Sequence, residues 1–211
     1  MEMEISMSVY RVWDRKYLTK LGERRPEFLL FYGHKVAEPV METCLSQWYP
    51  CVFEVDGVRY TSAEQYMMAE KAKLFGDEEI RAEILGTSDP KKCKSFGRKV
   101  KNFNKTVWDQ EKRLIVSVGN FEKFMQNDDL RNFLLSTGDK VLVEASPTDR
   151  IWGIGLGKNN PYALDPVKWR GENLLGFILM EVRNEIAILD MYGEFDDEED
   201  YEDMEEQNNI D

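Results

Sequence analysis

Two charged side chains occupy the face that one expected helix should bury. The segment TSAEQYMMAEKAKLF, residues 61–75, has Ser62 followed three residues later by Gln65, which is the pattern of a capping box at a helix start. An unpaired carboxylate or ammonium in apolar surroundings costs on the order of several kcal/mol, so its placement needs a reason. At 3.6 residues per turn, one helix face carries Glu64, Met67, Met68, Lys71, Leu74 and Phe75.

Glu64 and Lys71 are seven residues apart, which separates them by about 10 Å along a helix axis. That distance is too long for a direct helical ion pair but suits two side chains that hold one ligand between them. A purely structural explanation is also available. Glu64 would lie in the first turn, where the helix dipole favours negative charge, and the stem of Lys71 could carry its ammonium to water.

A second group of candidate residues lies in a long segment rich in Gly, Pro and Asn that runs to residue 172. Asp149 lies near Trp152, and Gly153 and Gly155 allow a ligand to approach the backbone closely. The GIGLG spacing does not match either common phosphate-binding glycine motif, and a plain glycine-rich turn explains it equally. An alternation typical of a strand is formed by Ile151, Ile154 and Leu156.

The turn CLSQWYP, residues 44–50, offers a hydroxyl and two aromatic rings. Ser46 could bind a polar ligand, and Trp48 or Tyr49 could stack on a nucleobase. Aromatic side chains also pack in cores, so the pattern alone leaves both interpretations open.

Composition limits the available chemistry. The chain has 211 residues, of which 42% are hydrophobic and 12% aromatic, enough for one packed core. No apolar run approaches the roughly 18 residues of a membrane span, and the N-terminus does not resemble a signal peptide, so we expect a cytoplasmic protein. With a single histidine, His34, a histidine triad is excluded, and we expect no metal and no cofactor. The cysteines lack metal-ligand spacing and are expected to be reduced thiols: Cys44, Cys51 and Cys93.

The net charge of −12 is concentrated at the C-terminus. Residues 194–211 hold 11 acidic and no basic residues, and removing them from the chain's 40 acidic residues leaves 29 against 28 basic ones. Such a segment is expected to be solvated and disordered and to repel nucleic-acid phosphates. It fits a solubilising tail or an acidic interaction tail.

The elements that must position these residues are mainly helical. Besides the helix at 63–75, helices are expected at 105–126, within DDLRNFLLSTG, and from Asn173 to about residue 189, with shorter ones between them. Strands are expected at 28–32 and 141–145, and Asp56-Gly57 predicts a two-residue hairpin. The sequence therefore predicts an α+β fold, a predominantly helical single domain with a small β-sheet.

Several of these segments, taken in order, resemble the NADAR domain family, also known as the YbiA-like N-glycosidases. The resemblance rests on the motifs FYGH, CLSQWYPCVFEVDGVRYTSAEQYMMAEKA, FGRKV, LLSTGD, VLVEASPTDRIWGIGL and WRGENLLGFILMEVR. It implies three regions: an N-terminal extension at 1–27, the N-glycosidase domain at 28–189, and an acidic, disordered tail at 190–211.

The resemblance implies hydrolysis of a C1–N bond of ribose. The substrate would be an ADP-ribosylated guanine, free or in nucleic acid, or a phosphoribosylamino-pyrimidine intermediate of riboflavin synthesis. The implied catalytic residues are Glu64, Lys71 and Asp149. The implied substrate-binding residues are Ser46, Trp48, Arg98, Trp152, Gly153 and Asn173. The substrate is a nucleotide carrying ribose phosphate or ADP-ribose, with no membrane partner, and the sequence leaves the oligomeric state undecided.

Two reaction paths are consistent with these residues. Glu64 or Asp149 could stabilise an oxocarbenium-like ribosyl centre or activate water, while a carboxyl group of raised pKa protonates the leaving base. Alternatively, Lys71 could attack C1 and form a Schiff base. Arg98 would be a natural phosphate ligand, although it also fits a surface residue in a basic stretch.

Two other classes of function remain as alternatives. A non-catalytic module that binds ADP-ribose or NAD would need stacking and phosphate contacts but not both Glu64 and Lys71. A helical interaction protein regulated by its acidic tail would explain the tail but none of the motifs.

Overall fold

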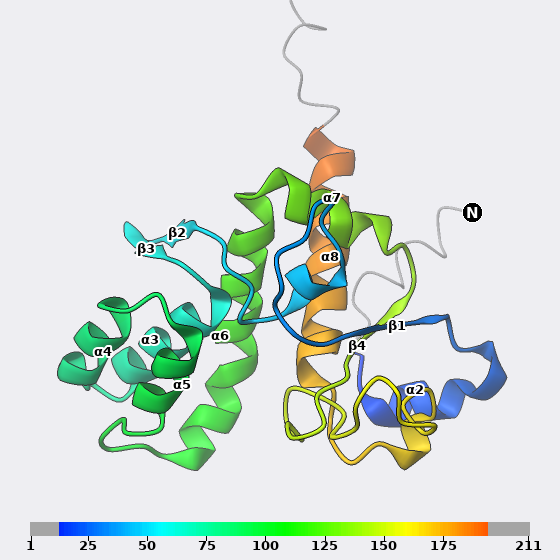
Figure 1. Ribbon diagram of the computed structural model, residues 1–211, viewed down its shortest axis with the longest axis horizontal. Helices are drawn as coiled ribbons and strands as arrows, with labels where there is room; N and C mark the ends of the chain where they lie inside the picture. Colours follow the sequence, from blue (N-terminus) through cyan, green and yellow to red (C-terminus); the bar gives the residue numbers. More distant parts are fainter. Residues whose placement is uncertain (1–12, 194–211) are drawn as a thin grey trace, which may run out of the picture.

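The computed structural model describes residues 13–193, in which helices predominate around two small pairs of strands (Figure 1). The predicted α+β class is confirmed. The helices are α2 Arg15–Leu21, α3 Ala63–Leu74, α4 Glu78–Leu85, α5 Pro90–Gly97, α6 Lys105–Met125, α7 Asp128–Ser136 and α8 Leu174–Gly193, with short 3-10 turns η1 Gly22–Arg24, η2 Glu42–Leu45 and η3 Pro166–Lys168. The strands are β1 Phe28–Phe31, β2 Phe53–Val55, β3 Val58–Tyr60 and β4 Val141–Glu144.

The first pair of strands joins distant parts of the chain. β1 and β4 are parallel, with Phe28 opposite Val141 and Phe31 opposite Glu144. Every residue of β4 is buried, as expected of a parallel strand covered on both faces, and α8 packs beside it. β4 therefore carries its last residue, Glu144, into the interior of the protein.

The second pair is the predicted hairpin. β2 and β3 are antiparallel, and the two residues between them, Asp56 and Gly57, have positive φ angles of 50° and 75°. This is the backbone that a two-residue hairpin turn requires. The hairpin leads directly to the start of α3.

The start of α3 confirms half of the predicted capping box. Ser62 Oγ accepts a hydrogen bond from Gln65 N at 3.2 Å, as expected. Gln65 Oε1 accepts instead from Thr61 N at 2.7 Å, while its Nε2 donates to the carbonyl oxygens of Ile84 and Thr87. Gln65 thus ties α3 to the end of α4.

Helices α3, α4 and α5 form one group, and α6 runs beside α8 through the centre (Figure 1). α5 begins as its Asp-Pro sequence predicts, because Asp89 accepts from the backbone N–H of Lys91 and Pro90 occupies the first turn. Gly97 at the end of α5 lies against Met68 of α3, where an added Cβ would come within 2.0 Å of the methionine sulfur.

Two boundaries differ from the sequence-based expectations. Residues 15–24 of the expected extension are helical and pack on the domain: Arg15 Nε donates to Pro166 O at 2.9 Å, and Leu18 is fully buried. α8 extends to Gly193 rather than about residue 189. The remainder of the expected extension, residues 1–12, and the acidic residues 194–211 lie outside the described range.

The strand-like alternation at 151–156 was misleading. Ile154 and Leu156 are buried but Ile151 is half exposed, and the segment is a folded loop. Backbone hydrogen bonds hold it, with Ile154 N donating to Glu144 O at 2.9 Å and Asn173 N to Gly153 O at 3.2 Å. Between residues 13 and 193, no helix combines the length and apolar character that crossing a bilayer would require.

Candidate active site

Glu64 occupies the first turn of α3 and is only 3% exposed. Its backbone N–H donates to Gln47 O at 2.8 Å, which fixes the helix start against the 44–50 turn. Burial raises the pKa of the carboxyl group to about 7, although the charge of Lys94 and a hydrogen bond from the Trp48 side chain oppose the shift. Oε1 has no hydrogen-bond partner among the described residues. Glu64 is thus a buried carboxyl group that changes charge near neutral pH.

Glu144, at the end of β4, is a second buried carboxyl group, and sequence reasoning missed it. Its side chain is 8% exposed, and burial together with the negative charge of Asp149 raises its pKa to about 8. The charges of Lys158 and Lys94 oppose this shift. A charged residue at the carboxyl end of an apolar strand was the available signal, since ligands often bind at that end of parallel strands.

Asp149 uses its two carboxylate oxygens differently. Oδ1 accepts hydrogen bonds from Ile151 N at 2.9 Å and Trp152 N at 2.8 Å, which holds the loop after β4 in shape. Oδ2 lies 3.9 Å from Lys94 Nζ. Asp149 therefore organises its own loop and also presents a charge to α5.

Lys94 of α5 connects the three carboxyl groups. Its ammonium lies near Asp149, lies 5.8 Å from the centre of the Trp48 ring, and lowers the pKa of both Glu64 and Glu144. Sequence reasoning missed this residue because five lysines and one arginine lie between residues 91 and 101, and no local pattern distinguishes one of them. The structure brings Glu64, Trp48 and Asp149 together around Lys94.

Asn173 and Gly153 hold the backbone of β4 that carries Glu144. Asn173 is fully buried; its Oδ1 accepts from Glu144 N at 2.9 Å and its Nδ2 donates to Leu142 O at 2.9 Å. An added Cβ at Gly153 would come within 2.7 Å of Glu144 O, so glycine allows the loop to lie directly on β4. These contacts position the backbone of Glu144. Trp152, which follows Asp149, is partly buried against the core.

The 44–50 turn is held by a lysine that the sequence did not single out. Lys123 of α6 is fully buried, and its ammonium donates to Cys44 O at 2.6 Å and Ser46 O at 3.0 Å. Within the turn, Ser46 Oγ accepts from Trp48 N at 3.1 Å. Lys123 and Ser46 therefore fix the backbone that carries Trp48.

The two basic residues implied by the resemblance, Arg98 and Lys71, lie in surroundings different from that of Lys94. Arg98 is exposed at the end of α5, and its charge acts on Glu64. Lys71 donates from Nζ to Gly97 O at 2.7 Å, and its ammonium lies 4.3 Å from the centre of the Phe103 ring. Burial lowers the pKa of Lys71. In the described structure, the contacts of Lys71 are with the end of α5 and with the Phe103 and Trp108 rings.

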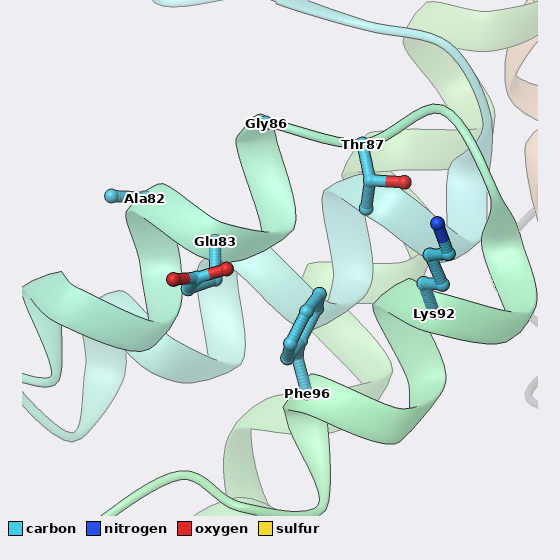
Figure 2. Close-up of a pocket in the computed structure, with 6 residues that line it drawn as sticks. All are labelled: Ala82, Glu83, Gly86, Thr87, Lys92 and Phe96. Atoms are coloured by element: carbon cyan, nitrogen blue, oxygen red, sulfur yellow. The ribbon is translucent and has the colours of Figure 1, made fainter.

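A separate hollow of about 460 Å³ lies between α4 and α5 (Figure 2). It contains none of the carboxyl groups described above and is lined by Ala82, Glu83, Gly86, Thr87, Lys92 and Phe96. Within the described range, no three His, Cys, Asp or Glu side chains are arranged to hold a metal ion.

Comparison with known families identifies the domain. The model of the NADAR domain matches residues 30–187. The chain belongs to the NADAR domain family.

Individual relatives agree with this assignment. The chain is 50% identical over 145 residues to N-glycosidase R617 of Acanthamoeba polyphaga mimivirus, covering 66% of this chain and 85% of that protein. It is 38% identical over 181 residues to Protein irg-1 of Caenorhabditis elegans, covering 78% and 82%. The NMR structure of the E. coli protein YbiA has a TM-score of 0.63 and 28% identity, covering 79% of this chain and 89% of that one.

Proposed function

We propose that this N-glycosidase hydrolyses the bond between ribose C1 and the nitrogen of an ADP-ribosylated guanine or of a phosphoribosylamino-pyrimidine intermediate of riboflavin synthesis. The observation that carries the proposal is the arrangement of Glu64, Glu144 and Asp149 around one lysine beside the Trp48 ring. The relatives named N-glycosidases, R617 of mimivirus and YbiA of E. coli, support the type of bond.

The surroundings of each carboxyl group suggest its part in the reaction. A base stacked on Trp48 would lie beside Glu64, whose carboxyl group carries a proton for part of the time at neutral pH and can pass it to the leaving nitrogen. The Asp149 carboxylate, held by two backbone N–H groups, is placed to stabilise positive charge that develops on the ribose ring. Glu144, whose pKa is about 8, can act as the base for the attacking water in its deprotonated form.

The lysines offer a covalent path. An amine that attacks C1 displaces the base, whose nitrogen takes a proton from a carboxyl group; ring opening then gives a protonated imine that water hydrolyses. Lys71 is one candidate, since burial lowers the pKa of its ammonium. Lys94 is a second candidate, with a carboxylate 3.9 Å away that can accept its proton.

The substrate-binding roles complete the proposal. Ser46, Trp152 and Gly153 would shape the pocket, Asn173 would hold Glu144 in place, and Arg98 would bind phosphate at the exposed end of α5. No metal or cofactor takes part in the proposed reaction.

The test offers the purified protein an ADP-ribosyl-guanosine oligonucleotide and a phosphoribosylamino-pyrimidine separately and follows released sugar by mass spectrometry. Glu64→Gln, which keeps the shape of the side chain, should abolish release of the sugar. Release from one substrate alone identifies the physiological class. Binding of ADP-ribose without release from either substrate would favour the non-catalytic ADP-ribose or NAD-binding module.

A further inference from the structure

Gln47 is a buried amide without hydrogen bonds. The residue is only 7% exposed, and neither Nε2 nor Oε1 has a hydrogen-bond partner among the described residues. Buried side-chain amides are nearly always hydrogen-bonded, so an amide with both groups unpaired calls for an explanation. Five other described residues each have one such unpaired atom: Glu64, Arg81, Asn120, Arg131 and Arg183.

The backbone of Gln47 is bonded to that of the proposed acid. Gln47 O accepts the backbone hydrogen bond from Glu64 N at 2.8 Å, and the next residue, Trp48, bonds to the Glu64 carboxyl group. Three unpaired buried atoms, two on Gln47 and Oε1 of Glu64, thus belong to two residues whose backbones are bonded to each other. Their concentration at one place indicates that a ligand supplies the missing partners.

Hydrogen bonds hold the backbone on both sides of Gln47, while its side-chain amide makes none. Lys123 holds the carbonyl oxygens of Cys44 and Ser46, and Ser46 Oγ holds Trp48 N, on either side of Gln47. A rigid backbone with an uncommitted amide is an arrangement that lowers the entropic cost of binding an outside partner.

The chemistry of an amide defines that partner. A glutamine side chain presents one donor and one acceptor side by side in a plane, which is how amides bind a nucleobase edge through two hydrogen bonds. Guanine and the pyrimidinone ring of the riboflavin intermediates both carry an N–H next to a C=O, a lactam edge. We propose that Gln47 is a specificity-determining residue that binds the lactam edge of the leaving base. This inference rests on the proposed function, whose two candidate substrates share that edge.

The test measures binding rather than turnover. Guanosine 5′-monophosphate and ribose 5-phosphate are titrated calorimetrically into the wild type and Gln47→Leu, a variant of similar volume. We expect the affinity for guanosine 5′-monophosphate to fall by about 10- to 100-fold, the range of one or two lost base-edge hydrogen bonds, with that for ribose 5-phosphate unchanged. Equal weakening of both ligands, no weakening, or failure of the wild type to bind guanosine 5′-monophosphate would overturn the proposal.

Thermal stability provides a second, independent measurement. Replacing an unpaired buried amide by an apolar side chain should leave the melting temperature unchanged or raise it. A clear drop would show that the amide is bonded in the free protein, by water or by the chain, and would also refute the inference. If Gln47 shows the expected binding while the wild type releases sugar from neither substrate, the proposed hydrolysis fails and the base-binding role of Gln47 stands.

Discussion

The ammonium nitrogen of Lys94 lies 3.9 Å from Oδ2 of Asp149, and both charges of this pair act on each of the two buried glutamates. The negative charge of Asp149 raises the pKa of Glu64 and of Glu144, and the positive charge of Lys94 lowers both. The protonation of the two glutamates is therefore set partly by a single ion pair.

Replacing Asp149 by Asn should shift the pH dependence of activity. The asparagine oxygen can still accept from the backbone of Ile151 and Trp152, so the loop should stay folded while the charge is lost. Without that charge the pKa of Glu64 and Glu144 should fall, and the alkaline limb of kcat/KM against pH should move to lower pH. Asp165→Asn is the matched control, because Asp165 makes a similar backbone contact, to Val167 N at 3.0 Å, near η3. If the alkaline limb of kcat/KM is unshifted in Asp149→Asn, the effect of the Asp149 charge on the two glutamates is contradicted.

The same glutamates should make stability depend on pH. Their pKa values in the folded protein, about 7 and about 8, are raised above the ordinary value of 4.5. Between these limits the folded state binds more protons than the unfolded state, so the free energy of unfolding falls as the pH rises from about 4.5 to about 8. Each unit of pKa shift corresponds to about 1.4 kcal/mol.

Denaturant unfolding at pH 5 and pH 8 tests this dependence. Glu64→Gln and Glu144→Gln should each lose part of the difference in the free energy of unfolding that the wild type shows between the two pH values. Glu54→Gln, on the exposed middle residue of β2, should preserve the whole difference. A wild-type protein equally stable at both pH values would show that neither glutamate has the raised pKa.

The two lysines can be separated by trapping. If the covalent path operates, borohydride added during turnover should reduce an imine, and peptide mapping should find the sugar on Lys94. Lys94→Met should abolish both the adduct and turnover without changing the melting temperature, because the Lys94 side chain is 38% exposed and pairs only at 3.9 Å.

Lys71→Met should instead lower the melting temperature, since it breaks the 2.7 Å bond to Gly97 O and the contact with the Phe103 ring. An adduct on Lys71, with unchanged stability of Lys71→Met, would indicate that Lys71 on α3 is the attacking amine. Turnover without any adduct would favour direct hydrolysis.

A glycine in the loop after η3 should be essential to the site. An added Cβ at Gly171 would come within 2.2 Å of Gly153 O and 2.7 Å of Arg150 Cα, and backbone atoms cannot move aside easily. We expect Gly171→Ala to destabilise the protein by about 1–3 kcal/mol, as overpacking does, and to reduce kcat by displacing Asp149. Gly157→Ala, in the loop before η3 and with open space around its Cβ, should be neutral in both measurements. Equal behaviour of the two variants would contradict this packing.

Local signals in the sequence predicted the start of α3 and the β2–β3 hairpin correctly. The Ser62–Gln65 spacing located the start of α3, and Asp56-Gly57 located the hairpin, because each depends on backbone preferences within four residues. The conflict between the buried face of α3 and Glu64 was also visible, and it pointed to a residue of the candidate site.

The residues around Glu64 were not predictable in this way. Lys94 and Glu144 enter the cluster through the packing of α5 on α3 and the pairing of β4 with β1, and neither contact has a local signature. The surroundings of Lys71 on the shared helix face were not visible in the sequence either. Two turns beyond Glu64, the same face meets Gly97 and Phe103 instead of the 44–50 turn, so Lys71 enters different surroundings.

The parallel pairing of β1 with β4 has a consequence for biosynthesis. Residues 28–31 have no strand partner until residues 141–144 have been synthesised. The backbone of Glu144 gains its hydrogen bond to Asn173 only after that residue has followed. A nascent chain leaving the ribosome therefore exposes an unpaired strand through most of its synthesis, and closing such a long loop slows folding. The helices between the two strands can form earlier, so the candidate carboxyl cluster is completed only after them.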